Sequence, residues 1–349
     1  NNLNWEFIQA APADYLPGYL DDDLLYLRQI HDAINTKIGA QANGKPAVMG
    51  FSMGGWYTLN LAATSDPDAY SCALSINPPL DLHTGLRALD QLFRAPAGDK
   101  NPDSIKESAL AKLLTIQVQG SSPEKGSDLP FSDQEASYLI GLSYRFTLTQ
   151  TIMSSLEIAR SLKAHEKVGV LSWEDYYSKI IAPALAKRNI DANAMSQASN
   201  LRTREAGLTA VKDLKLVLTG NDFLLTKEGL AWFRERFPGE RTIFTETGGH
   251  MGQLYRQEVR YAMRAAIRQP TTIATTKTLA TSNKAPKNTK INLSAFTDVA
   301  TLHLNVGYAS VTERYDGSIY SATVDADDNV HFVHAISGDS PPTGSNDLM

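Results

Sequence analysis

Ser52 stands at the centre of the pentapeptide Gly50-Phe51-Ser52-Met53-Gly54, which matches the pattern Gly-x-Ser-x-Gly. Strand-type residues precede the pentapeptide, and a helix-type pattern follows it. A serine at such a strand-to-helix turn is exposed above the sheet, and its neighbours are small because the strand and the helix pack closely. The backbone N–H of Met53 can then point at a developing oxyanion. We therefore predict a nucleophilic serine; the alternative is a glycine-rich turn without catalysis.

A serine hydroxyl becomes a good nucleophile beside a general base, and that base needs an acid to orient it. His250 lies in the glycine-rich loop 247–252, directly after a predicted strand and before a predicted helix. Asp222 lies in the turn 220–223, directly after the predicted strand 214–219. The separation of 28 residues between Asp222 and His250 accommodates one helix and one strand. We therefore predict His250 as the base and Asp222 as its acid.

Other residues are alternatives for the acid or for metal binding. Asp81 follows the predicted strand 70–76, but it can also cap the next helix, which is the interpretation we favour. Glu246 is four residues from His250 and is expected at the surface. The pattern D-x-D-x-N at 325–329 resembles the start of a calcium loop but lacks the glycine and glutamate that complete one, so a turn is expected. The remaining histidines have no comparable loop context and are expected to be structural or solvated: His31, His83, His165, His303, His331 and His334.

The turn around Ser52, the Gly-x-Asp turn and the Gly-Gly-His-x-Gly loop together resemble the α/β-hydrolase superfamily, over about residues 1–81 and 208–268. The resemblance implies a serine hydrolase in which Ser52 attacks a carboxylic ester, His250 transfers the proton and Asp222 fixes the imidazole tautomer. A thioester or an amide is a less expected substrate. The resemblance implies neither a metal nor a cofactor. The alternative from a different class is a binding protein that keeps the fold without turnover.

The elements that would position these residues follow an α/β pattern with a mainly parallel sheet. Three aspartates begin the predicted helix 21–38, where the positive end of the helix dipole favours them. Short apolar segments bounded by turn residues predict strands, and longer periodic segments predict helices. Strands are expected at 5–8, 47–49, 70–76, 214–219 and 241–245, and helices at 21–38, from the Ser52 turn to about 63, at 226–237 and at 253–268.

Between residues 82 and 207 the predicted strands disappear and helical stretches follow one another. One helix face carries apolar residues that are expected to form the core of this insertion, with a binding pocket as the alternative. The resemblance implies that residues 82–207 form a lid, whose apolar character favours an acyl or otherwise hydrophobic substrate. The apolar residues of that face are Leu142, Phe146, Met153 and Leu156. The helical stretches are 83–93, 103–115, 133–163, 173–188 and 192–211.

The composition changes after residue 268. Residues 271–290 contain seven threonines and no aromatic residue, which is typical of a linker. Residues 291–349 alternate apolar and polar residues between turn signals and are expected to form a small β-rich tail, separate from a hydrolase core of residues 1–81 and 208–270. The tail is a candidate interaction or anchoring element. The basic linker would either be solvated, which we favour, or contact the acidic tail or an anionic surface.

Composition narrows the classes of function further. The chain of 349 residues carries 33 basic and 38 acidic residues, a net charge of −5, which argues against a dedicated nucleic-acid binder. Its single cysteine, Cys72, excludes an internal disulfide and a cysteine-based zinc site, and apolar neighbours predict a buried thiol. The apolar segment 46–65 contains three glycines and is interpreted as strand, turn and helix, so no transmembrane segment is expected. A bacterial exported protein is slightly favoured, and the oligomeric state is left open.

The region before the serine is shorter than the α/β-hydrolase pattern requires. Only 49 residues precede Gly50, and the predicted helix 21–38 takes 18 of them. The resemblance implies a further strand beside the strand 46–50, with a second oxyanion N–H in the loop that follows it. Without that strand, an unpaired apolar edge would be an aggregation hazard. We therefore expect that the chain begins midway through a longer gene product or works with a segment supplied separately.

Overall fold

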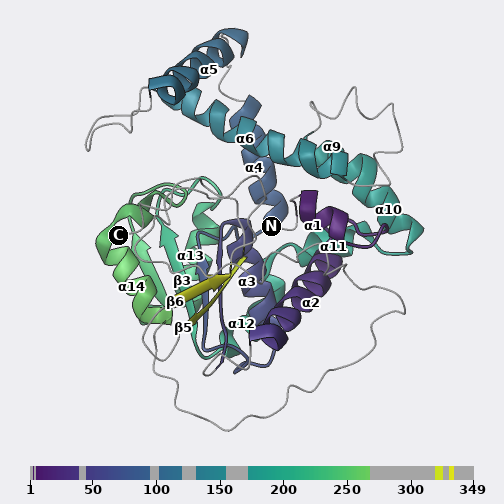
Figure 1. The fold of residues 1–349 in the computed structure, drawn as a ribbon, viewed down its shortest axis with the longest axis vertical. Helices are drawn as coiled ribbons and strands as arrows, with labels where there is room; N and C mark the ends of the chain where they lie inside the picture. Colours follow the sequence, from purple (N-terminus) through teal and green to yellow (C-terminus); the bar gives the residue numbers. More distant parts are fainter. Residues whose placement is uncertain are drawn as a thin grey trace.

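The computed structural model shows a mixed α/β protein, which the alternation of strand and helix patterns predicts. A central sheet is flanked by helices that come from distant parts of the chain (Figure 1). The structure describes residues 3, 5–38, 45–94, 102–119, 131–154, 172–267, 319–324 and 330–333.

Within the described residues, the sheet has six strands in the order β4-β3-β2-β1-β5-β6. The strands from β4 to β1 are parallel, so their carboxyl ends meet at one edge of the sheet. β5 runs antiparallel to β1, and β6 runs antiparallel to β5. The strands are β1 (Ala47–Phe51), β2 (Cys72–Ile76), β3 (Leu214–Thr219), β4 (Thr242–Thr245), β5 (Ile319–Val324) and β6 (Val330–Val333).

Alternate residues of the parallel strands point to opposite faces of the sheet, and each face packs against its own helices. Val48 and Ala73 belong to a large apolar cluster that includes Trp56 of α3. Cys72 belongs to the cluster on the other face, which includes Met263 of α14. Both faces are therefore buried, as parallel sheets require. The helices around the sheet are α2 (Leu20–Ile38), α3 (Met53–Ala63), α12 (Glu205–Ala210), α13 (Lys227–Arg236) and α14 (Gln257–Ile267).

A helical insertion connects β2 to β3. In Figure 1, α5 and α6 project from the rest of the molecule, and α4 lies between them and the sheet. A buried ion pair joins α4 to α6, with 2.8 Å between Asp90 Oδ1 and Arg145 Nε. The helices of the insertion are α4 (Leu82–Arg94), α5 (Pro102–Gln119), α6 (Asp133–Ser154), α9 (Trp173–Tyr176), the π-helical turn η2 (Tyr177–Ile181), α10 (Ala182–Lys187), α11 (Ala192–Ala198) and the short η3 (Leu201–Arg204).

The apolar stripe that the sequence assigns to the core of the insertion is buried only in part, and it does not coincide with the most buried face of α6. Phe146 is 66% exposed, and Leu142 is only half-buried. The buried face instead contains Arg145 and Leu148. It is rotated from the apolar stripe because Arg145 points inward to its ion pair with Asp90. The stripe residues whose side chains lie outside the described part of the chain are Met153 and Leu156.

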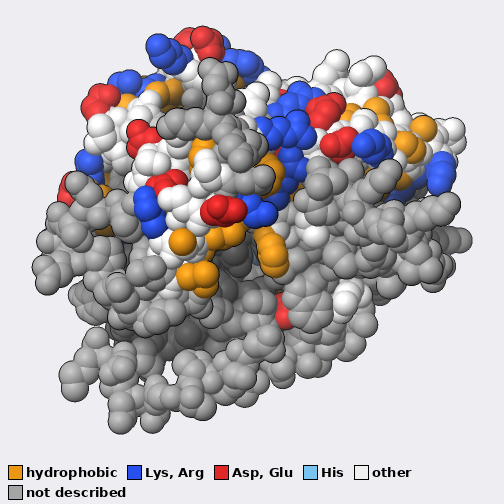
Figure 2. All heavy atoms as spheres, turned by 90° about the horizontal axis from the view of Figure 1, so that it is seen from above, with side chains coloured by type: hydrophobic (Ala, Val, Ile, Leu, Met, Phe, Trp, Pro, Cys, Tyr) orange, Lys and Arg blue, Asp and Glu red, His pale blue; other side chains and the backbone are white. Residues whose placement is uncertain are grey.

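The outer side of the insertion carries large apolar side chains that are exposed to solvent. Leu113 and Leu114 are exposed on α5, and Ile140 is exposed on α6. Figure 2 views the molecule from this side and shows hydrophobic side chains among charged ones. The surface is therefore mixed and not uniformly polar. Among the helices of the described residues, none has the length and hydrophobicity needed to cross a membrane.

The N-terminal segment is helical, so the prediction of a strand at 5–8 is wrong. α1 (Trp5–Ala10) buries one side against the start of α2. Phe7 and Ala11, which are one helical turn apart, lie in the same cluster as Tyr15 and Tyr26. Two adjacent apolar residues in so short a segment fit either a strand or a helix, and the packing of α1 decides between them.

The C-terminal strands belong to the central sheet, so the prediction of a separate β-rich tail is wrong for these strands. β5 pairs with β1 along residues 47–50, so a strand of this chain lies at the edge where we expected one from a missing or separately supplied segment. A segment with strand-type alternation can pair with any open edge within reach, and its sequence does not specify which one. The predicted linker 271–290 and the predicted turn at 325–329 lie outside the described residues.

The remaining predicted strands and helices of the sheet region are confirmed, with shifts of one or two residues at their ends. The predicted strand 214–219 matches β3 at both ends. The predicted helix 253–268 is divided between the short η5 (Gly252–Tyr255) and α14. Such small differences at element ends are expected, because capping and fraying decide them.

Candidate active site

Ser52 occupies a strained turn between β1 and α3. Its backbone has φ 52° and ψ −120°, a conformation that residues with a Cβ atom rarely adopt. Its N–H donates to the carbonyl oxygen of Ile76 in β2 at 2.8 Å, which fixes the turn to the neighbouring strand. The Ser52 side chain makes no capping hydrogen bond to α3. The hydroxyl is therefore at the carboxyl edge of the sheet and is not used by the helix.

Glycines permit the close approach of β1 and α3 at this turn. A Cβ atom at Gly50 would lie 2.1 Å from the carbonyl oxygen of Gly54, which is far inside van der Waals contact. A Cβ atom at Gly55 would lie 2.8 Å from Ser75 Oγ. The need for glycine at Gly50 confirms that the strand and the helix pack closely at this turn. Gly55 extends the same requirement beyond the Gly-x-Ser-x-Gly pattern.

The amino terminus of α3 adds an electrostatic element to the site. Met53 is the first residue of α3, so its N–H has no acceptor one turn earlier within the helix. The helix dipole also places partial positive charge at this end. An anion formed beside Ser52 would thus meet the Met53 N–H as a donor together with a favourable potential.

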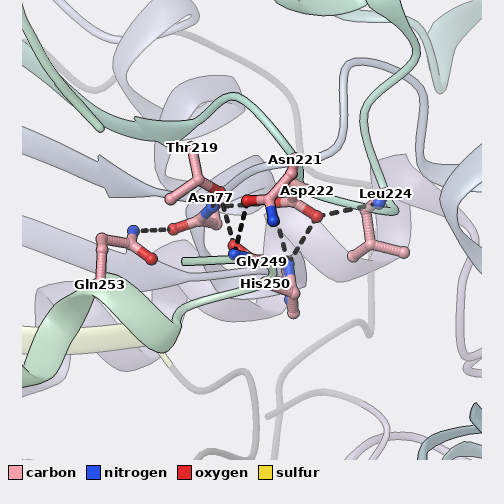
Figure 3. Close-up of polar contacts among 8 residues, drawn as sticks. All are labelled: Asn77, Thr219, Asn221, Asp222, Leu224, Gly249, His250 and Gln253. Carbon is pink, nitrogen blue, oxygen red and sulfur yellow. Dashed lines mark hydrogen bonds and ion pairs between the residues drawn. The ribbon is translucent and has the colours of Figure 1, made fainter. Parts of the chain in front are cut away.

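His250 and Asp222 form a direct pair at the ends of neighbouring strands (Figure 3). His250 Nδ1 lies 3.1 Å from Asp222 Oδ1 and 3.0 Å from Asp222 Oδ2. The backbone N–H of Leu224 donates to Asp222 Oδ1 at 2.9 Å. The carboxylate is buried, whereas the histidine is partly exposed. Because Nδ1 faces an acceptor, this arrangement orients Nε2 as the free nitrogen of a neutral imidazole.

The loop that carries His250 is shaped by left-handed backbone positions. Gly248 has φ 144°, Gly249 has φ 57° and Met251 has φ 67°. The N–H of Gly249 donates to Asn221 Oδ1 at 2.7 Å, and the Thr219 hydroxyl donates to the Gly249 carbonyl oxygen. The end of β3 therefore holds the loop through two hydrogen bonds just before the histidine.

A continuous set of contacts connects Ser52 to the His250–Asp222 pair. The Ser52 N–H bonds to Ile76, and the next residue, Asn77, donates from Nδ2 to Asp222 Oδ2 at 2.7 Å. All of these groups lie at the carboxyl ends of β1, β2, β3 and β4, where open α/β sheets place their sites. No hydrogen bond joins the Ser52 hydroxyl to the His250 imidazole among the described residues. Hydrogen bonds between a nucleophile and its base are often formed only when substrate is bound.

In the described residues, neither of the two rival acids pairs with His250. Asp81 Oδ1 accepts from the backbone N–H of Thr84 at 2.7 Å, so Asp81 caps the start of α4 as the sequence predicts. Its other oxygen accepts from the Ser199 hydroxyl at 2.9 Å. Glu246 is exposed, also as predicted. Asp222 is thus the carboxylate that pairs with His250.

Two further histidines are described with their side chains, and both are in structural settings. His83 is buried against the rings of Trp173 and Tyr177, and burial lowers its pKa to about 4. His31 contacts the Asn35 amide, and burial also lowers its pKa. Both side chains are therefore neutral at physiological pH. The histidines whose side chains lie outside the described residues are His165, His303, His331 and His334.

Within the described residues, no three or more histidine, cysteine, aspartate or glutamate side chains are grouped so as to hold a metal ion. Cys72 is buried in β2, and burial raises the pKa of its thiol to about 12. The thiol is therefore protonated and enclosed, which confirms the prediction of a buried cysteine.

The sequence interpretation missed Asn77 and Gln253, which lie behind the acid. Asn77 directly follows β2, and Gln253 lies in η5, three residues after His250. Polar residues that directly follow parallel strands converge at one edge of the sheet, and this rule would have singled out Asn77. No comparable rule exists for Gln253, because its approach to Asn77 depends on the path of the loop.

No protein-family model matches this sequence, and no curated protein matches it.

Proposed function

We propose that this protein is a serine hydrolase that cleaves a carboxylic ester through an acyl-enzyme on Ser52. The observation that carries the proposal is the strained backbone of Ser52 between β1 and α3. A position at φ 52° would suit glycine better, so a serine there implies that its hydroxyl has a use. The pairing of His250 with Asp222 at the same edge of the sheet supplies the base and acid that such a use requires.

In the proposed reaction, Ser52 Oγ attacks the ester carbonyl carbon while its proton passes to His250 Nε2. Asp222 accepts a hydrogen bond from the Nδ1–H group of His250 and thereby stabilises the imidazolium that forms; the proton stays on His250. The negative charge on the former carbonyl oxygen is met by the Met53 N–H. Collapse of this intermediate transfers the proton to the leaving alcohol and leaves the acyl group on Ser52. Water, deprotonated by His250, then releases the carboxylic acid and restores the serine.

The proposed fold family is the α/β-hydrolase superfamily, with residues 82–207 as its lid. Support for this comes from the order of the three residues along the chain, each directly after a strand or within the loop that follows one. Support for a lid comes from the helical insertion, which begins with α4 directly after the loop that follows β2. The exposed apolar side chains of α5 and α6 favour an ester with a hydrophobic acyl chain. Thioesters and amides are the next candidates.

A fluorophosphonate probe tests the proposal directly, because it bonds to an activated serine oxygen and releases fluoride. We expect the full-length protein to be labelled on Ser52, as mass spectrometry of the labelled peptide would show. Ser52→Ala should lose the label, whereas Ser178→Ala, at an exposed position of η2, should keep it. A panel of esters with graded acyl length would then give the chain preference.

The alternative of a binding protein without turnover predicts a different result. In that case the folded wild-type protein would remain unlabelled and would not hydrolyse any ester of the panel. Labelling that persists in Ser52→Ala would instead show that another residue reacts and would exclude Ser52 as the nucleophile.

A further inference from the structure

Asn77 directly follows β2 and has an unusual backbone conformation, which directs its side chain. Its backbone has φ 46°, in the left-handed region that asparagine tolerates better than most residues. Its N–H donates to the Val217 carbonyl oxygen of β3 at 2.8 Å. The residue is fully buried. This backbone turns the Asn77 side chain across the carboxyl end of β3, toward the acid of the proposed triad (Figure 3).

Each polar atom of the Asn77 side chain has a defined partner. Nδ2 donates to Asp222 Oδ2 at 2.7 Å and to the Thr219 hydroxyl oxygen at 3.1 Å. Oδ1 accepts from Gln253 Nε2. The carboxylate oxygen of Asp222 is an acceptor and therefore needs the Asn77 amide nitrogen, and the Asn77 carbonyl oxygen is then left to accept from Gln253 Nε2. Asn77 therefore presents N–H groups, and not its oxygen, to the carboxylate.

The contacts of Asp222 show what the Asn77 donor does. His250 Nδ1 lies within 3.1 Å of both carboxylate oxygens, so this contact alone does not fix the plane of the carboxylate. The Leu224 N–H holds Oδ1, and the Asn77 amide holds Oδ2. With one donor on each oxygen, the carboxylate cannot rotate without losing a hydrogen bond. A buried donor lost in this way is costly, because no water replaces its partner.

We propose that Asn77, supported by Gln253, is the positioning residue that orients Asp222 for His250. The proposal rests on the proposed hydrolase function. Asn77 does not touch the substrate; it acts through Asp222 on the orientation of the imidazole. In the described residues, the titratable side chain that contacts Asp222 is His250. The side-chain partners of Asn77 there are Asp222, Thr219 and Gln253, of which only Asp222 is titratable.

Asn77→Asp is the variant that separates positioning from packing. Aspartate has the same shape and also tolerates a positive φ, so the fold is expected to persist. Its carboxyl would lie about 2.7 Å from Asp222 Oδ2, and two carboxyls at this distance share one proton. While the proton is shared, the new carboxyl donates to Asp222 as the amide does. At higher pH the proton is lost, and two adjacent negative charges repel each other.

The expected result is therefore a change in the pH profile of ester hydrolysis. Asn77→Asp should keep kcat within about tenfold of wild type at the acidic end of the active range and lose about 10- to 100-fold more at the alkaline end, the size expected for a lost hydrogen bond to a charged group. KM should change little. Asn193→Asp makes the same chemical change at an exposed position of α11 and should keep the wild-type profile.

A second variant guards against poor folding of Asn77→Asp. Asn77→Gly relieves the positive φ, removes the donor, and should lower kcat by about 10- to 100-fold at all pH values. A wild-type pH profile in folded Asn77→Asp, or a loss that is equal at all pH values, would overturn the positioning role. So would full activity of Asn77→Gly. If wild-type protein itself neither hydrolyses esters nor reacts with the fluorophosphonate probe, the proposed function fails instead, and the two failures are distinguished.

Discussion

Gly50→Ala tests whether the turn at Ser52 depends on the contact between β1 and α3. The added Cβ atom would lie 2.1 Å from the Gly54 carbonyl oxygen, 2.3 Å from the Gly54 carbonyl carbon and 2.6 Å from Thr58 Oγ1. To reach even 3.0 Å, the first of these distances must grow by about 0.9 Å. Gly54 and Thr58 are buried on α3, so the helix has to move as a unit.

Overpacking of this kind lowers stability by about 1 to 3 kcal/mol, and the upper end applies here because two of the three obstructing atoms belong to backbone. We expect a loss of about 3 kcal/mol in the free energy of unfolding, measured by urea denaturation with an unchanged slope. Because the displaced helix begins directly after Ser52, ester hydrolysis should fall as well.

The matched control is Gly252→Ala, since a Cβ atom there meets nothing within 4 Å and the backbone φ is not positive. Its stability should be unchanged or raised by up to about 1 kcal/mol, because alanine restricts the unfolded chain. Equal urea midpoints for Gly50→Ala and the wild type would refute the close approach of β1 and α3 at this turn.

Two further predictions concern buried titratable groups away from the triad. Burial raises the pKa of Cys72 to about 12, so iodoacetamide at neutral pH should leave the folded protein unmodified and alkylate it after unfolding in urea; fast alkylation of the folded protein, seen by intact mass, would contradict this. Burial lowers the pKa of His83 to about 4, below its value of about 6.5 in the unfolded chain. Between about pH 6.5 and pH 4, the unfolded chain therefore binds a proton at this side chain that the folded protein does not bind. As the pH decreases through this range, the free energy of unfolding falls by about 3 kcal/mol because of His83. His83→Phe should lose that part of the pH dependence of thermal unfolding, and an undiminished dependence would show that His83 is not its source.

The parts of the candidate site whose placement the sequence predicts are those that depend on local chain geometry. The turn at Ser52 needs glycine at position 50 because the strand and the helix approach closely there, and the pentapeptide 50–54 is enough to indicate this. Asp222 and His250 are recognisable because each follows a strand whose apolar pattern is clear, and parallel strands bring their carboxyl ends together. Their pairing at 3.0 Å follows from the order of those strands in the sheet.

The parts that the sequence does not predict depend on contacts between distant segments. The burial of Arg145 on α6 follows from its partner Asp90 on another helix, and no pattern within α6 indicates it. The helical form of α1 depends on Tyr15 and Tyr26, and the pairing of β5 with β1 depends on an edge far away in the chain. In each case a short segment fits two structures, and tertiary contacts select one.

The residues with strained backbone conformations gather at the candidate site. In the described residues, four residues other than glycine have positive φ, and three of them are Ser52, Asn77 and Met251. These three lie in the loops that follow β1, β2 and β4, at the edge of the sheet that carries the proposed triad. Such conformations destabilise a protein by about 1 to 3 kcal/mol each, and the packing around them must offset that strain. A fold kept only for stability would replace these residues with glycine at little loss. In the proposed reaction, the side chain of Ser52 is the nucleophile and that of Asn77 donates to the acid, while Met251 directly follows the base. The backbone strain and the hydrogen bonds of Asp222 are therefore two independent indications of the same site.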